Sequence, residues 1–186
     1  MNQRNMLSLP DQDLKRLEII GAIIVCILAP VFHFLFEWSG DNTFVGIFAA
    51  VNESVWEHTK IVYFPFLFYS IAEYFILRPD FRQFFAAKTL SMSLILLLMI
   101  TFFYTYSGMF GMESLIIDII FTFVLTILVF YLSYRFYTSG TDFDNVFLLI
   151  VILFAAILAM ELFFTAFPPE IPLFQDSVTG SFGFPR

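Results

Sequence analysis

The sequence has few charged residues and almost no cysteine. Only 13% of its 186 residues are charged, whereas a soluble domain carries about 25%. This shortage excludes a soluble enzyme, because too few polar groups are available to cover a surface in contact with water. The single cysteine, Cys26, excludes an intrachain disulfide and a cysteine-rich metal cluster.

Basic residues and catalytic signature motifs are also scarce. Nine Lys and Arg residues stand against sixteen Asp and Glu residues, a net charge of −7. We therefore expect no nucleic-acid partner, since such a partner requires a basic face. The sequence contains no HExxH metalloprotease motif, no phosphate-binding loop, no GxSxG elbow and no glycine-rich dinucleotide turn.

Apolar residues are abundant: 60% of the chain is hydrophobic, 20% is aromatic, and 28 residues are Phe. A bilayer core of about 30 Å needs about 20 apolar residues in a helix. Five stretches meet this requirement, at 17–36, 55–77, 84–107, 112–137 and 146–167. The sequence therefore predicts an all-α, polytopic membrane helix bundle, a single membrane-embedded domain over 1–186 and a location in the cell membrane.

The distribution of Lys and Arg predicts the orientation of the chain. If the chain crosses five times, seven of the nine basic residues fall on one side: Arg4, Lys15, Arg16, Arg78, Arg82, Lys88 and Arg135. Only Lys60 and Arg186 fall on the other. Because positive loops stay in the cytoplasm, we expect an N-in/C-out topology. The extracytoplasmic tail, 168–186, would be extended or would fold back over the outer mouth of the bundle.

Costly ionisable residues collect at one depth of the predicted bundle. Counting residues from the outer ends of the spans puts seven of them within roughly 0–10 Å of the outer boundary. They are His33, Glu37, Glu53, Glu57, His58, Asp118 and Glu161. Four of the five predicted helices contribute, so this layer is the best candidate for a functional site.

The residue types in this layer favour a bound cation. Mixed imidazole and carboxylate ligands suit a divalent metal, zinc above all. We expect His33 and His58 to be ligands, with Glu57, Asp118 and Glu161 as oxygen donors. Glu37 and Glu53 would lie around the ligands, or act as the catalytic base if the site performs chemistry.

Structural roles explain some of the same residues. Ser54 and Glu57 match a helix capping box, and Glu57 also has the spacing for an ion pair with Lys60. Glu37, Glu53 and Glu113 fit solvated loop or helix-end residues. His33, Asp118 and Glu161 fit hydrogen bonds between helices. Glu73 lies toward the inner side, and we expect a structural role for it, with water, Arg78 or Arg82 as its partner.

Three segments carry a resemblance to a known family. VFHFLFEWSG (31–40), VNESVWEHTKIVYFP (51–65) and FQDSVTGSFGF (174–184) resemble an uncharacterised family of small bacterial multi-pass integral membrane proteins. The resemblance covers essentially the whole chain. It implies a bacterial inner-membrane protein and implies no activity.

A more distant likeness concerns the segment NESVWEH (52–58). It looks like the Asn-Glu-Ser…Trp…His stretch of the alkaline ceramidase and adiponectin receptor superfamily, whose members are zinc-dependent membrane amide hydrolases with seven helices and three His ligands. This chain has two His residues and five predicted spans, so a carboxylate would have to replace one ligand.

Three functional hypotheses follow from the outer layer. The first is a metal-dependent membrane hydrolase acting on a lipid or lipid-linked substrate. The second is a proton- or ion-coupled transporter that uses the carboxylates as relays. The third is a non-enzymatic membrane protein in which the cluster binds a cation or ties the helices together.

Overall fold

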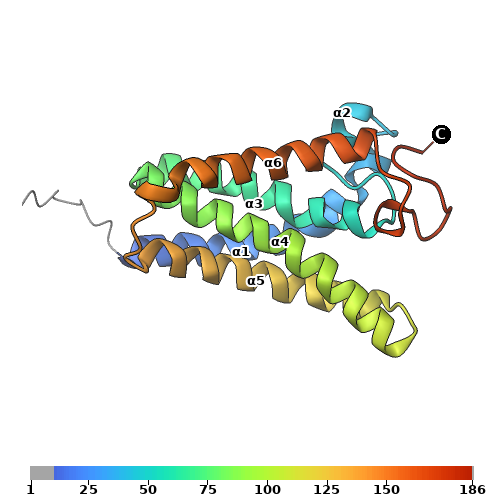
Figure 1. Cartoon of the computed structure of the whole chain (residues 1–186), viewed down its shortest axis with the longest axis horizontal. Helices are drawn as coiled ribbons and strands as arrows, with labels where there is room; N and C mark the ends of the chain where they lie inside the picture. Colours follow the sequence, from blue (N-terminus) through green and yellow to red (C-terminus); the bar gives the residue numbers. More distant parts are fainter. Residues whose placement is uncertain (1–10, 186) are drawn as a thin grey trace, which may run out of the picture.

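The computed structural model describes residues 11–185, and helices dominate this part of the chain (Figure 1). The α-helices are α1 (Asp11–Trp38), α2 (Thr43–Gly46), α3 (Val55–Leu77), α4 (Phe81–Phe110), α5 (Leu115–Thr138) and α6 (Phe147–Ala166). Two 3-10 turns, η1 (Asp144–Val146) and η2 (Pro172–Phe174), complete the set. Within 11–185 the only β pairing is one isolated bridge, between Gln175 and Phe182.

Five of these helices are long and apolar enough to cross a membrane, which confirms the predicted all-α class. They are α1, α3, α4, α5 and α6. The observed α1 and α4 begin before the predicted spans, because the polar residues that precede each apolar run are also helical. Arg4 and Arg186, two residues of the charge count, lie outside the described residues.

Local signals in the sequence set the helix ends. Helix α3 begins at Ser54, whose hydroxyl accepts a hydrogen bond from the backbone N–H of Glu57 at 3.2 Å. It ends at Arg78, which adopts a left-handed conformation directly before Pro79. Asp80 then caps α4 by accepting from the N–H of Gln83, and Gly111 ends α4 with a φ of +64°.

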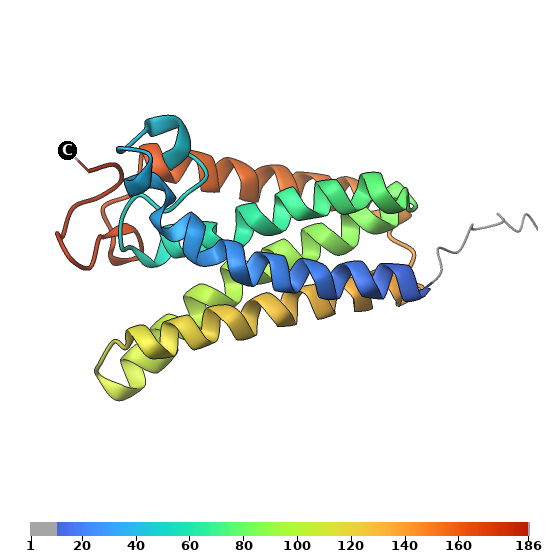
Figure 2. The ribbon, with the colours of Figure 1, turned by 180° about the vertical axis from the view of Figure 1, so that it is seen from behind.

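Successive long helices run in opposite directions and pack into one bundle (Figures 1 and 2). Helix α1 packs on α3 and α5, while α4 packs on α3, α5 and α6. The α4–α5 hairpin is close to the other helices along most of its length, but its tip leans away from them (Figure 1). The two ends of the bundle therefore differ, and we call the end with the C-terminal segment 167–185 the tail end.

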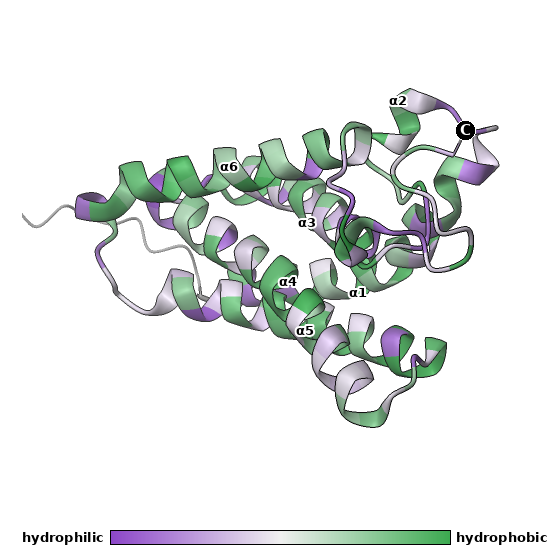
Figure 3. Cartoon of the chain, turned by 45° about the vertical axis from the view of Figure 1, so that its right-hand side comes forward, coloured by the Kyte–Doolittle hydropathy of each residue, from purple (hydrophilic) through white to green (hydrophobic). Residues whose placement is uncertain are grey.

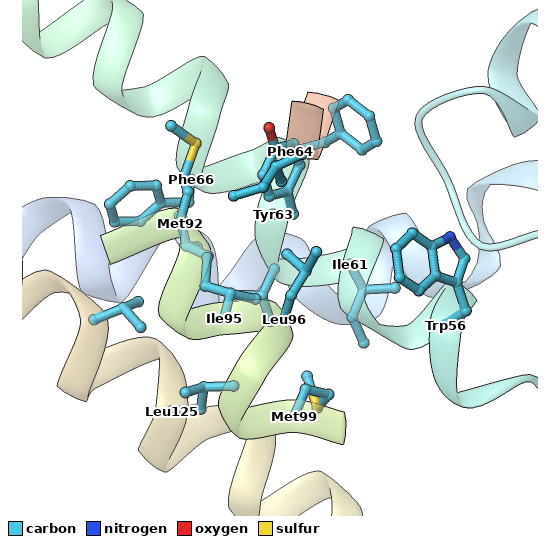
Figure 4. Packing of buried hydrophobic residues seen from close by; sticks show 14 of the residues in the cluster. Trp56, Ile61, Tyr63, Phe64, Phe66, Met92, Ile95, Leu96, Met99 and Leu125 are labelled. Carbon is cyan, nitrogen blue, oxygen red and sulfur yellow. The ribbon is translucent and has the colours of Figure 1, made fainter. Parts of the chain in front are cut away.

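The shared core lies where α3, α4 and α5 meet (Figure 4). Tyr63 and Phe66 from α3 pack with Ile95 from α4 and Leu125 from α5, and all four are essentially fully buried. Outside this core the helix surfaces stay apolar. Leu148 on α6 and Ile116 on α5 expose 71% and 70% of their surfaces, which suits contact with lipid rather than water. Figure 3 shows the same pattern, with hydrophilic colour mainly at helix ends and in the connecting segments.

A buried charge cluster lies at the end opposite the tail. The Lys88 ammonium group is 3.0 Å from the Glu18 carboxylate and 2.6 Å from that of Glu73. The prediction that Glu73 pairs with Arg78 or Arg82 is wrong, because Lys88 points into the bundle toward α3 while Arg82 pairs with Asp144. Lys88, counted above among the seven basic residues on one side of the membrane, is almost completely buried.

The C-terminal segment folds back over the tail end, which decides between the two alternatives left open by the sequence. Phe174 is buried against Trp56 of α3 and Phe164 of α6. The Asn52 side chain donates a hydrogen bond to the carbonyl of Gly183 at 2.8 Å. The segment therefore braces the loop before α3, where several of the predicted site residues lie.

Candidate metal centre

Three of the predicted site residues meet at the tail end: His33, Glu53 and His58. The Nε2 atoms of the two histidines are 3.3 Å apart. One carboxylate oxygen of Glu53, Oε2, lies 3.5 Å from His33 Nε2 and 3.3 Å from His58 Nε2. We refer to these three residues as the His–Glu–His group.

Each member of the group comes from a different segment. His33 lies near the end of α1, His58 lies in the first turns of α3, and Glu53 is in the connection between them. The backbone N–H of Ala50 donates to the carbonyl of Phe32, which ties this connection to α1. Asn52 accepts from the N–H of Ser54 at 2.9 Å, which fixes the turn that enters α3. The fold thus presents the carboxylate between the two imidazoles.

The spacing of the three ligand atoms matches that around a tetrahedral metal ion. Zinc–nitrogen and zinc–oxygen bonds of about 2.0–2.1 Å at tetrahedral angles place neighbouring ligand atoms roughly 3.3–3.4 Å apart. The three observed edges, 3.3, 3.5 and 3.3 Å, form nearly such a triangle. Three protein ligands would leave the fourth position open, as in catalytic rather than purely structural zinc sites.

The site is reached by solvent, and its electrostatics favour an ionised carboxylate. The side chains of His33, His58 and Glu53 are 21%, 31% and 42% exposed. Hydrogen bonds from His33 and His58 hold the pKa of the Glu53 carboxyl well below its usual range. A carboxylate that stays charged near neutral pH is the form that binds a metal ion.

The His–Glu–His group lies at the edge of a large cavity. The cavity has a volume of about 850 Å³ and is lined by α1, α3, α4, α5 and the C-terminal segment. Its walls are mainly apolar, with Pro30 of α1, Met99 and Phe102 of α4, and Phe121 of α5 among them. Sites for small ligands measure about 300–1,000 Å³, so this cavity is at the large end of that range.

Glu57 and Glu161, two predicted oxygen donors, lie in a separate buried network. The Lys60 ammonium group donates to Glu57 at 2.9 Å, to the hydroxyl of Thr165 at 2.9 Å and to the carbonyl of Gly46 at 2.7 Å. Glu161 accepts from the hydroxyl of Thr59 at 3.0 Å. The anticipated Glu57–Lys60 ion pair is therefore present, deep in the bundle.

The capping box predicted at the start of α3 forms only in part. Ser54 caps the backbone of Glu57, but the Glu57 carboxylate accepts from the N–H of Val51 at 3.1 Å. The Glu57 carboxylate therefore does not belong to the His–Glu–His group.

The remaining predicted residues lie near the group without belonging to it. Asp118 lines the same cavity from α5 and accepts a hydrogen bond from the Tyr106 hydroxyl at 2.7 Å. Glu37 is exposed and shares a small hollow of about 120 Å³ with His33 and Glu53. Of the seven residues in the predicted layer, three meet and two more lie beside them.

Two acidic residues of the cavity, Glu113 and Asp176, are not among the seven residues of the predicted layer. Glu113 lies in the connection between α4 and α5, where an exposed acidic residue is common and gives no signal of a site. Asp176 lies more than one hundred residues beyond the group in the C-terminal segment. No local pattern could have placed it there, because its position depends on the return of the segment over the tail end.

The fold and the group define a multi-span helical bundle with a histidine–carboxylate site at one end. Residues 6–184 match the model of DUF6512, a family of unknown function, and the chain belongs to this family. No curated protein and no solved structure matches the chain. The family membership agrees with the resemblance to an uncharacterised family and assigns no activity.

Proposed function

We propose that this protein is a multi-pass cell-membrane protein that binds one divalent transition-metal ion through His33, His58 and Glu53. The observation that carries the proposal is the near-equilateral triangle of ligand atoms, with edges of 3.3, 3.5 and 3.3 Å. The three ligand atoms come from α1, from α3 and from the connection between them, and their triangle leaves room for one ion at about 2.0–2.1 Å from each atom. Zinc is the expected ion, since two imidazoles and one carboxylate form a common catalytic zinc ligand set.

The location of the ion follows from the orientation we propose for the chain. With the N-terminus in the cytoplasm, the tail end faces the extracytoplasmic side. The group is then near the outer membrane boundary, between the lipid-facing helices and the folded C-terminal segment. This position is accessible to metal ions from the medium and to lipids from the outer leaflet.

The cavity favours a second, more specific function, a metal-dependent hydrolase acting on a lipid or lipid-linked substrate. An apolar cavity of about 850 Å³ beside the group offers room for a hydrocarbon chain. A bound zinc ion supplies Lewis-acid activation of water. Glu37 lies beside the group in the small hollow, where we propose that it accepts a proton as general base.

Elemental analysis of the detergent-purified full-length protein tests metal binding. We expect about one zinc, iron or manganese ion per chain, with loss of that ion in His33→Ala and His58→Ala variants that remain monodisperse. Glu37→Gln is the matched control, because Glu37 lies next to the group without contributing a ligand atom. A wild-type protein that contains no metal after purification without chelators would refute the proposal.

A further inference from the structure

The cavity beside the His–Glu–His group has a one-sided charge distribution. Four carboxylates line it: Glu53 of the group, Glu113 after the α4–α5 turn, Asp118 of α5 and Asp176 of the C-terminal segment. Among the described residues, no Lys or Arg side chain lines the cavity. This imbalance persists with a metal bound, since four negative charges exceed the two positive charges of a divalent ion.

The three lining carboxylates outside the His–Glu–His group have no cationic partner among the described residues. Within residues 11–185, none of the ion pairs involves Glu113, Asp118 or Asp176. Elsewhere two buried carboxylates pair with lysine, at Glu57–Lys60 and at Glu73–Lys88. In the cavity, Asp118 accepts from the Tyr106 hydroxyl, and Asp176 accepts from the Val178 N–H and the Thr179 hydroxyl, so their partners are neutral. The absence of a cation in this cavity is therefore a local property of the site, and a bound ligand is one way to supply the positive charge.

The lining of the cavity combines apolar side chains with carboxylates. Aromatic and aliphatic side chains of α4 and α5, including Phe102, Phe121 and Ile119, form the apolar walls. The acidic residues lie toward the α4–α5 turn and the C-terminal segment, at the tail end of the bundle. Leu115 and Ile119 of α5 line the cavity and expose 71% and 47% of their surfaces, so this side of the cavity faces the apolar, lipid-exposed surface of the bundle.

From this arrangement we infer that the cavity binds a lipid whose head group carries a protonated amine. The hydrocarbon chain lies against the apolar walls of α4 and α5, and the ammonium group lies beside Glu113 and Asp118. Lipids with a purely anionic head group are disfavoured, because their charge would face several unpaired carboxylates. The inference deepens the proposed lipid hydrolase by naming its substrate class, and it rests on that function only for the chemical step.

Direct binding measurements with three probes of equal chain length test the inference. Tritiated hexadecylamine, hexadecanol and palmitate are each titrated onto detergent-purified full-length protein, and bound probe is counted by scintillation proximity. We expect hexadecylamine to bind with a Kd about tenfold lower than that of palmitate, equivalent to about 1.4 kcal/mol. Palmitate binding as tightly as hexadecylamine, or no saturable binding of the amine, would overturn the inference.

Two variants localise the effect. Asp118→Asn keeps an oxygen that accepts the Tyr106 hydrogen bond, and Glu113→Gln alters an exposed residue, so both are expected to fold. Each should raise the Kd for hexadecylamine several-fold and leave the Kd for hexadecanol unchanged. An equal change for both probes would indicate a distorted cavity and would contradict the assigned role of the carboxylates.

Repeating the titrations after removal of metal separates this inference from the metal proposal. The preference for the amine should persist or increase without the metal, because the positive charge of the ion is removed from the site. If the protein as purified contains no metal and still prefers the amine, the metal centre is refuted and the lipid class is supported. A metal-containing protein without the preference would do the reverse.

Discussion

The Nε2 atoms of His33 and His58 lie 3.3 Å apart, although 25 positions separate the residues in the sequence. Two imidazole nitrogens at this distance cannot both carry a proton directed at the other, and two bare lone pairs would repel. A shared proton or a metal ion resolves the conflict. Glu53 Oε2 lies 3.5 Å from His33 Nε2 and 3.3 Å from His58 Nε2, so this carboxylate is placed to bind the same ion.

Zinc binding should depend on pH. Because histidine and carboxylate ligands must be deprotonated to bind a metal, protons compete with the ion. We expect the wild-type protein to hold zinc at about pH 7.5 and to release most of it by about pH 5.5, where histidine side chains are ordinarily protonated. Equilibrium dialysis against zinc across this range measures the release. Zinc content that is constant down to the acidic end would contradict ligation by the two histidines.

Removal of the Glu53 charge should give a stability difference with a defined pH dependence. The pKa of this carboxyl is lowered in the folded protein, so its ionised form stabilises the fold above the unfolded value of 4.5. That stabilisation decreases as the pH falls below about 4.5 toward the lower folded pKa.

In metal-free protein, Glu53→Gln should therefore lower Tm at neutral pH, and the difference from wild type should shrink in acid. Thermal unfolding followed by tryptophan fluorescence measures both. A difference that grows on acidification would contradict the assigned hydrogen bonds from His33 and His58.

Lys60 should be important for stability because it is fully buried and neutralises Glu57. Lys60→Met leaves the Glu57 carboxylate buried without its partner, which costs about 3–5 kcal/mol for buried pairs of this kind. The double variant Lys60→Met/Glu57→Gln removes both charges and should recover a large part of this loss. Denaturant unfolding in detergent compares the three proteins. Equal loss in the single and double variants would show that the ion pair itself is not the stabilising element.

A pair of glycines tests the close packing of α1. A Cβ atom at Gly21 would overlap the rings of Phe130 and Tyr69, whereas a Cβ atom at Gly108 of α4 would meet nothing within 4 Å. Gly21→Ala should lower stability by about 1–3 kcal/mol through overpacking. Gly108→Ala should be neutral or stabilise by up to about 1 kcal/mol. Thermal unfolding of the two variants provides the comparison, and similar Tm values would contradict the packing of α1 against α3 and α5.

The sequence predicted the helices well because their cause is local. An apolar run of about 20 residues must satisfy its own backbone hydrogen bonds in a bilayer, and it does so as a helix regardless of what its neighbours do. The observed α3, from Val55 to Leu77, has the same bounds as the predicted span. The ends of α1 and α4 differ because polar residues such as Arg82 can extend a helix beyond the membrane, and hydropathy does not detect this extension.

The candidate site was only partly predictable. Counting residues along a helix gives the depth of a side chain, and depth correctly placed His33 and His58 in one layer. It does not give the direction in which a side chain points. Glu57 precedes His58 by one residue, about 100° around the helix axis, and this rotation turns its carboxylate toward Lys60 and Thr165 instead of the cavity.

The sequence by itself therefore determined the class of this protein, the number of its long helices and the set of ionisable residues whose burial in a membrane is unfavourable. Each of these depends on composition and on spacing along one chain segment. Only the tertiary structure decided that His33, Glu53 and His58 form the candidate metal centre, and that Glu113 and Asp176 join Asp118 in the cavity. These contacts depend on helix rotation and on the return of the C-terminal segment, which are set by packing between residues far apart in the sequence.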